Sequence, residues 1–149
     1  MDIFKKYNAH NKTTEFKNRE ASFEDRQRLA KKLKNAPLIK VKFDADDVVP
    51  KMQAIHQLCP QSQFILDANE AWDIRLLQKL VMPLKACNVA LIEQPFPAEE
   101  DDDLLVFSSP IAICADESCH SAAGLEQLRE KYQAVNIKLD KTGGLSEAV

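Results

Sequence analysis

Three apolar stretches of this chain each end in a carboxylate residue. The three residues are Asp67, Glu93 and Asp116, spaced 26 and 23 residues apart. A step of that length accommodates one strand, one helix and two loops, so each carboxylate is predicted to end a buried parallel strand. Carboxylates from neighbouring strands lie close enough together to bind a hard divalent cation, and we expect Mg²⁺ or Mn²⁺ as the cofactor. Without a cation, three such carboxylates repel one another, and at least one takes up a proton.

Two lysines extend this series on either side. Lys42 ends the apolar stretch before that of Asp67, and Lys138 ends the one that follows Asp116. In an eight-stranded barrel, strands four apart in order face each other, which would place one amine on each side of a substrate. Such an arrangement suits a 1,1-proton transfer. One base removes an α-proton and the other returns a proton to the opposite face, with a metal-stabilised enediolate between the two steps. Lys42 and Lys138 are therefore the predicted catalytic bases.

A third lysine, Lys40, is predicted to make Lys42 a better base. An unperturbed lysine has a pKa of about 10.4 and is a poor base at neutral pH. Lys40 precedes Lys42 by two residues and shares its face of the strand, roughly 7 Å away. Its positive charge is expected to lower the pKa of Lys42. Alternatively, both lysines are solvated at an exposed strand edge.

The polar residues also allow interpretations other than a shared site. Each charged residue alone fits a helix cap or a solvated loop charge, whereas their recurrence at five successive strand ends favours a shared site. Asn69 and Gln94 each follow a predicted ligand and are candidates to orient it, with a purely structural role equally compatible. A soft-metal site at Cys114, Cys119 and His120 lacks a second pair of ligands. The four cysteines are expected to be reduced and buried.

Strand and helix signals alternate along the chain. Helices are predicted from Ser22 to Asn35, from Asp47 to Cys59, from Ile74 to a kink or end near Pro83, from Leu104 to Phe107, and onward from Ser121 and Leu145. The acidic run 99–103 is interpreted as the solvated N-terminus of the short helix. Alternation of this kind is typical of parallel strands with right-handed crossovers, whose carboxyl ends share one face. The predicted fold class is α/β, an incomplete (β/α) TIM-type barrel of about five to six βα units.

Length and composition bound the organisation of the chain. Residues 1–20 are predicted to form a polar N-terminal segment, in which residues 13–16 are the one strand candidate, and residues 21–149 a partial barrel domain. The formal net charge of −3 and the lack of a basic stripe exclude a nucleic-acid partner. No apolar run has the length of a signal peptide or a membrane span. We therefore expect a cytoplasmic protein with no membrane partner.

The motifs as a set resemble those of a known family. Lys40-Val41-Lys42, Asp67-Ala68-Asn69, Glu93-Gln94-Pro95, Asp116-Glu117-Ser118 and Lys138-Leu139-Asp140 resemble signatures of the muconate-lactonising branch of the enolase superfamily. The run 134–145 is most similar to dipeptide epimerases of the L-Ala-D/L-Glu type and to N-acyl amino acid racemases. Lysine bases paired with Mg²⁺ are established chemistry of that superfamily. The resemblance implies an isomerase with metal ligands at Asp67, Glu93 and Asp116, bases at Lys42 and Lys138, tuned by Lys40, and a dipeptide or N-acyl amino acid as substrate.

The resemblance also defines what we expect the chain to lack. Members carry an N-terminal capping domain and further barrel strands, for which 149 residues leave no room. A truncated barrel would leave two edges unpaired, which favours a homo-oligomer formed through those edges. One alternative function is an inactive barrel fragment or scaffold that retains metal binding. Another is an enzyme of the o-succinylbenzoate synthase or muconate cycloisomerase type, since these share the ligands and lysines.

Overall fold

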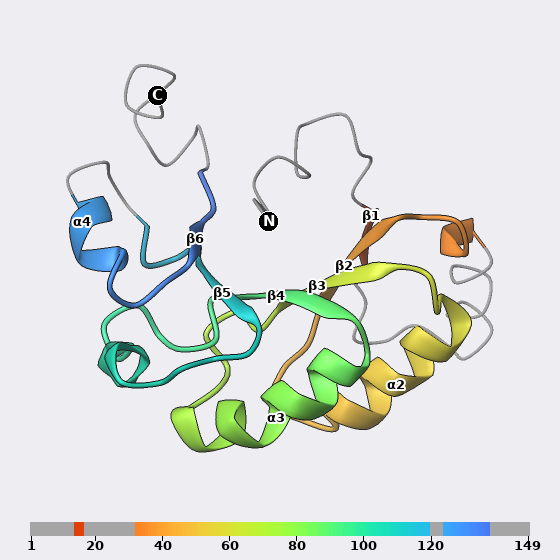
Figure 1. The fold of residues 1–149 in the computed structure, drawn as a ribbon, viewed down its shortest axis with the longest axis horizontal. Coiled ribbons are helices and arrows are strands. Elements are labelled where there is room, and N and C mark those ends of the chain that lie inside the picture. The colour runs from red at the N-terminus through yellow and green to blue at the C-terminus, as the bar shows by residue number, and fades with distance from the viewer. Residues whose placement is uncertain (1–13, 17–31, 120–123, 138–149) are drawn as a thin grey trace.

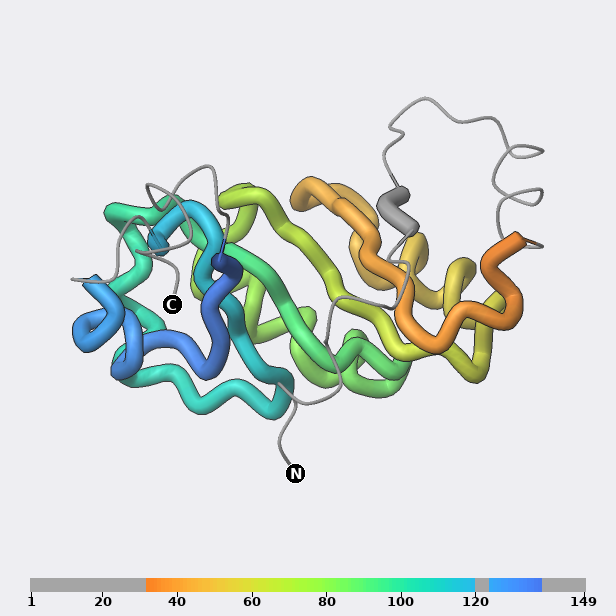
Figure 2. The backbone as a smooth tube through the Cα atoms, turned by 90° about the horizontal axis from the view of Figure 1, so that it is seen from above, coloured from red at the N-terminus to blue at the C-terminus, as the bar shows by residue number. Residues whose placement is uncertain are grey.

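The structure, a computed structural model, describes residues 14–16, 32–119 and 124–137. They form one parallel sheet in the order β1-β2-β3-β4-β5-β6. Its strands are β1 (Thr14–Phe16), β2 (Leu38–Lys42), β3 (Gln63–Asp67), β4 (Val89–Glu93), β5 (Ala112–Ala115) and β6 (Ala134–Val135). Each strand pairs with the next one along the chain, and Figure 2 shows the chain advancing across the sheet from the orange β2 to the blue β6. This is the predicted α/β fold of a (β/α) barrel fragment.

Two amphipathic helices, α2 (Val48–Leu58) and α3 (Ile74–Ala86), cover one face of the sheet (Figure 1). Their bounds confirm the two helices predicted between Asp47 and Cys59 and from Ile74. The Asp73 carboxylate caps α3 by accepting a hydrogen bond from the Leu76 N–H at 2.8 Å. The prediction of a kink or end near Pro83 was wrong about the end, because α3 continues through Pro83 to Ala86. A buried apolar face along α3 outweighs the one hydrogen bond that the proline removes.

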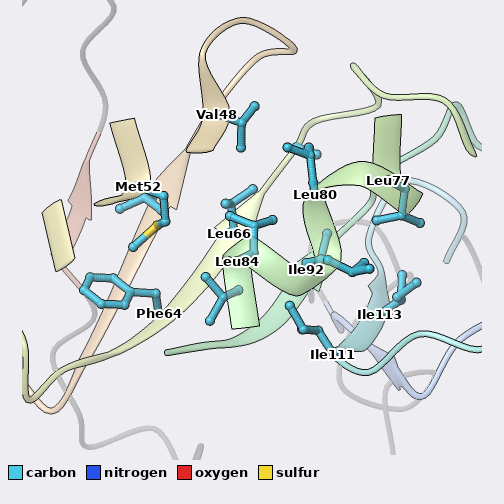
Figure 3. Packing of buried hydrophobic residues seen from close by; sticks show 14 of the residues in the cluster. Val48, Met52, Phe64, Leu66, Leu77, Leu80, Leu84, Ile92, Ile111 and Ile113 are labelled. Atoms are coloured by element: carbon cyan, nitrogen blue, oxygen red, sulfur yellow. The ribbon is translucent and has the colours of Figure 1, made fainter. Parts of the chain in front are cut away.

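The main apolar core lies between this sheet face and the helices. Figure 3 shows side chains of both layers in contact there, among them Val48, Met52, Phe64, Leu66, Leu77, Leu80, Leu84, Ile92, Ile111 and Ile113. Strand side chains alternate between the two faces of a sheet. A second, smaller cluster of Ile65, Leu91 and Cys114 is therefore formed on the opposite face. The side chains of Lys40 and Lys42 also lie on that face, as do the three carboxylates of Asp67, Glu93 and Asp116.

Smaller elements agree with the sequence to different degrees. β1 confirms the strand candidate at residues 13–16 and pairs with β2, while the boundary at residue 20 stays a prediction. The short helix expected from Leu104 to Phe107 is the 3₁₀-helix η2 (Asp102–Leu105), which begins two residues earlier. A short α4 (Leu125–Leu128) precedes β6. Most of the helix from Ser22, the residues 120–123 and everything from Lys138 onward lie outside the described residues. None of the described helices is long and apolar enough to cross a membrane.

Candidate metal and proton-transfer site

The three predicted ligands meet at the carboxyl ends of neighbouring strands. Asp67 and Glu93 are the last residues of β3 and β4 and lie directly opposite each other in the sheet register. Asp116 follows the last residue of β5. Their exposed fractions are 2%, 4% and 3%, so all three carboxylates are buried. The structure thus brings together the residues that the spacing of the strands predicted.

Two lysines of β2 bind these carboxylates. The Lys40 amine lies 2.7 Å from Glu93 Oε2 and 3.0 Å from Asp67 Oδ2. The Lys42 amine lies 2.9 Å from the same Asp67 Oδ2 atom. The Lys42 side chain is 34% exposed and that of Lys40 is 19% exposed. Lys40 is therefore the more enclosed cation, whereas Lys42 remains open to a ligand at the strand tips.

The charges at this site shift the pKa values of their neighbours. Burial alone lowers the pKa of Lys40, but the hydrogen bonds and charges of Glu93 and Asp67 outweigh it, and the pKa lies above its ordinary value. Lys40 thus stays protonated, and its ammonium group binds the Asp67 and Glu93 carboxylates directly. The two-residue spacing in the sequence predicts only an effect of Lys40 on Lys42. Its contact with Glu93 spans two strands and depends on the length of the lysine side chain, which the strand period does not reveal.

The pKa of Glu93 reflects the crowding of carboxyl groups at this site. Burial raises the pKa of Glu93 above its ordinary value, and the Lys40 amine only partly offsets this effect. The neighbouring Asp67 and Asp116 carboxyl groups also raise the pKa of Glu93. The direction of this shift is the one that adjacent carboxyl groups impose on one another.

The chemistry of these donors fits a hard divalent cation. Asp67, Glu93 and Asp116 offer buried anionic oxygens, which Mg²⁺ prefers. The Oε2 atom of Glu117 is also buried and has no hydrogen-bond partner among the described residues, as expected beside a cation or a further donor. Within that part of the chain, no group of three His, Cys, Asp or Glu side chains is already arranged as a ligand set. The Lys40 amine lies between two of the carboxylates, so a cation would compete with it, and the ligand roles stay a prediction.

Two asparagines support the carboxylates. The Asn69 N–H donates to Asp67 Oδ1 at 3.1 Å, and Asn69 has the positive φ of 48° that this turn requires. The Asn136 amide donates to Glu93 Oε1 at 3.0 Å from the strand end of β6. A residue that donates a hydrogen bond to a carboxylate oxygen fixes the orientation of that carboxylate. The predicted base Lys138 lies two residues beyond Asn136, outside the described residues.

The interpretation of the acidic run 99–103 was wrong for Asp101. Its side chain is buried, and its carboxylate accepts from Tyr132 Oη at 2.6 Å and from Lys131 Nζ at 2.6 Å. The partners lie about 30 positions further along the chain, a separation that carries no local signal. The four cysteines are confirmed as buried thiols.

Comparison with known proteins identifies the family of this site. Residues 24–149 match the family described as Enolase C-terminal domain-like. The chain belongs to that family. It is 56% identical over 116 residues to an N-acetyl-D-glutamate racemase of Pseudoalteromonas sp, covering 78% of this chain and 37% of that protein. It is 46% identical over 114 residues to the L-Ala-D/L-Glu epimerase of Escherichia coli K12, covering 76% and 36% of the two chains.

Solved structures of the enolase family share the fold. One, from Agrobacterium tumefaciens, is described as an enolase family member with homology to dipeptide epimerases, with bound sodium and L-Ala-L-Glu. Its TM-score is 0.81 at 36% identity, covering 91% of this chain and 41% of that one. Another is a dipeptide epimerase from Enterococcus faecalis complexed with Mg and the dipeptide L-Leu-L-Tyr, with a TM-score of 0.80 at 26% identity and coverages of 91% and 41%. This member of the enolase family thus spans little more than a third of the length of the curated relatives above.

Proposed function

We propose that this chain binds Mg²⁺ or Mn²⁺ through Asp67, Glu93 and Asp116 and takes part in a 1,1-proton transfer at the α-carbon of a dipeptide or N-acyl amino acid. The observation that supports this proposal best is the cluster of three buried carboxylates and two lysines on one sheet face. The names of the relatives agree with it, because both describe racemisation or epimerisation of a glutamate derivative.

Each lysine has a separate role in this proposal. Lys42 is the more exposed amine and contacts Asp67 from the rim of the cluster, so its Nζ atom is the one that exchanges a proton with the substrate. Lys40 stays protonated, and its ammonium group pairs with Asp67 and Glu93 beside Lys42. Lys138 is the proposed base on the opposite face. A bound divalent cation supplies positive charge that stabilises the negative charge developing on the substrate carboxylate.

Solvent deuterium incorporation at the α-carbon tests the proton transfer. The substrates are L-Ala-L-Glu, L-Ala-D-Glu and N-acetyl-glutamate of both configurations, incubated in heavy water with Mg²⁺. Because each base serves one face of the α-carbon, Lys42→Ala is expected to abolish exchange from one epimer and Lys138→Ala from the other. Lys85→Ala, which removes an exposed lysine at the end of α3, is the matched control and should leave exchange unchanged.

The result also separates this proposal from its alternatives. A folded chain that binds the cation but exchanges no α-proton would be a scaffold of the enolase family and would contradict the proposed chemistry. Syn elimination or cycloisomerisation of a larger acid would indicate the o-succinylbenzoate synthase or muconate cycloisomerase type.

We further propose that the chain self-associates through the outer strands of the described sheet. β1 and β6 each pair with one neighbour only among the described residues. Unpaired strand edges favour association with another chain. Light scattering at several protein concentrations is expected to show a defined oligomer, and a monomer at all concentrations would contradict this part of the proposal.

A further inference from the structure

Gln94 connects the tips of three strands through its main chain. It follows Glu93 with a φ of 37°, a left-handed conformation that is rare for a residue with a side chain and is maintained only by strong surrounding contacts. Its N–H donates to Cys114 O at 2.8 Å, and its carbonyl accepts from the Glu70 N–H at 2.9 Å. The turn after Glu93 is therefore tied both to the chain after β3 and to β5.

The Gln94 side chain is completely buried and holds the backbone around Asp116. Its Oε1 atom accepts from the Asp116 N–H at 2.8 Å and from the Ser118 N–H at 3.1 Å. Its Nε2 atom donates to Phe96 O at 2.9 Å. A backbone N–H only donates and a backbone carbonyl only accepts, so these partners determine which way the amide points.

A second set of contacts holds the Nε2 end of this amide. Nε2 lies 2.8 Å from Ser118 Oγ and 3.2 Å from Tyr132 Oη, both of which accept from it. Both hydroxyl groups then donate to Asp101 Oδ2, at 3.0 Å and 2.6 Å. One series of hydrogen bonds therefore runs in a single direction, from the Asp116 N–H through Gln94 and the two hydroxyl groups to the Asp101 carboxylate.

The final acceptor of these hydrogen bonds is the Asp101 carboxylate, which is stabilised in its ionised form. Burial alone raises the pKa of Asp101, but hydrogen bonds from Lys131, Tyr132 and Ser118 outweigh it and hold the pKa below its ordinary value. Burial, and then the hydrogen bond to Asp101, raise the pKa of Tyr132. The carboxylate thus stays ionised and the phenol stays protonated, which keeps the direction of the hydrogen bonds constant.

We propose that Gln94, held by Asp101 and Tyr132, is a positioning residue that sets the backbone at Asp116 and so determines where the Asp116 carboxylate lies relative to Asp67 and Glu93. The geometric part of this inference stands without a cation, whereas its consequence for cation affinity rests on the proposed function. Neither Asp101 nor Tyr132 reaches the carboxylates, so both act only through Gln94 and Ser118.

The test uses the full 149-residue chain and two independent measurements. The variants are Gln94→Met, which keeps the side-chain length, and Tyr132→Phe, which keeps the ring. Ser62→Ala is the matched control, because the Ser62 hydroxyl is equally buried and donates to Ala36 O at 2.7 Å just before β3, at the opposite end of the strands. The first measurement is the NMR resonance and hydrogen exchange of the Asp116 and Ser118 amides without metal. The second is the affinity for Mn²⁺, measured by paramagnetic resonance of the free ion.

Gln94→Met is expected to shift both amide resonances, to speed their exchange and to weaken Mn²⁺ binding by about 10- to 100-fold, with a smaller change of the same kind in Tyr132→Phe. Ser62→Ala should change none of these readouts. Unchanged amides at Asp116 and Ser118 in Gln94→Met would overturn the inference, and if that variant does not fold, Tyr132→Phe decides by the same criterion. Shifted amides in a chain that binds no Mn²⁺ would support the positioning role of Gln94 and refute the proposed cation site.

Discussion

The two sides of the carboxylate cluster are stabilised by different physical means. On the side of β2 and β3, Asp67 is surrounded by two ammonium groups, Lys40 and Lys42. On the side of β4 and β5, the backbone of Asp116 is held by the neutral amide of Gln94. Glu93 lies between them and takes part in both, through Lys40 on one side and Asp116 on the other.

This difference separates charge balance from geometry. Attraction between charges falls off slowly with distance and tolerates movement, whereas a hydrogen bond weakens steeply away from its preferred length and angle. The lysine side therefore offsets the cost of burying several carboxylates, and the Gln94 side determines where Asp116 lies. A cation that replaces the Lys40 amine would change the charge balance of the cluster and leave the position of the Asp116 backbone unchanged.

The largest effect is expected from removing charge on the lysine side. Lys40→Met should lower the free energy of unfolding by about 3 to 5 kcal/mol without metal, because Asp67 and Glu93 lose their shared cation. Denaturation by urea measures this change. Added Mg²⁺ should restore more stability in this variant than in the wild type, since the competing amine is gone. A loss below about 1 kcal/mol, the range of an exposed ion pair, would show that Lys40 does not compensate buried charge.

A smaller effect is expected on the amide side. Tyr132→Phe removes one of the donors to Asp101 and should lower the free energy of unfolding by about 1.5 to 3 kcal/mol. The same urea experiment measures it, and added Mg²⁺ should not restore this loss preferentially, because no charge near the cation has changed. A preferential rescue by Mg²⁺ would contradict the separation of the two sides.

The smallest effect is expected in the pH dependence of the free energy of unfolding, which should differ between the two sides. The pKa of Asp101 lies below its ordinary value of 3.8, so its contribution to stability is present above pH 3.8 and is lost as the pH falls through the lower folded value. The pKa of Lys40 lies above 10.5, so its contribution is present below pH 10.5 and is lost as the pH rises through the higher folded value. Asp101→Asn should reduce the loss of stability on the acid side of a plot of unfolding free energy against pH, and Lys40→Met should reduce the loss on the alkaline side. An unchanged acid side in Asp101→Asn, or an unchanged alkaline side in Lys40→Met, would contradict the contribution assigned to that residue.

The sequence predicted the strand tips well because they follow a simple period. Asp67 and Glu93 end successive strands and Asp116 directly follows the next one, and a parallel sheet places such ends on one face. The contacts between the tips could not be predicted in the same way. Lys40 reaches Glu93 across the intervening β3, and the position of its amine depends on side-chain length and rotamer.

Long-range partners were the other part that sequence patterns did not reveal. Asp101 belongs to a run of five acidic residues, and only its burial beside Tyr132 distinguishes it from the exposed Asp102 and Asp103. The sequence places Gln94 next to the predicted ligand Glu93. Its role at Asp116 instead depends on a left-handed turn that sends its side chain toward the next strand.

Titration of the chain with Mn²⁺ tests most directly whether the two sides form one cation site. The wild type is compared with Asp67→Asn from the lysine side, Asp116→Asn from the amide side and the exposed control Glu99→Gln. One bound Mn²⁺ per chain, with affinity reduced at least about tenfold by each of the first two substitutions and unchanged by the control, is the predicted result. An affinity for Mn²⁺ that stays unchanged in Asp67→Asn or in Asp116→Asn would contradict a shared site at these strand tips.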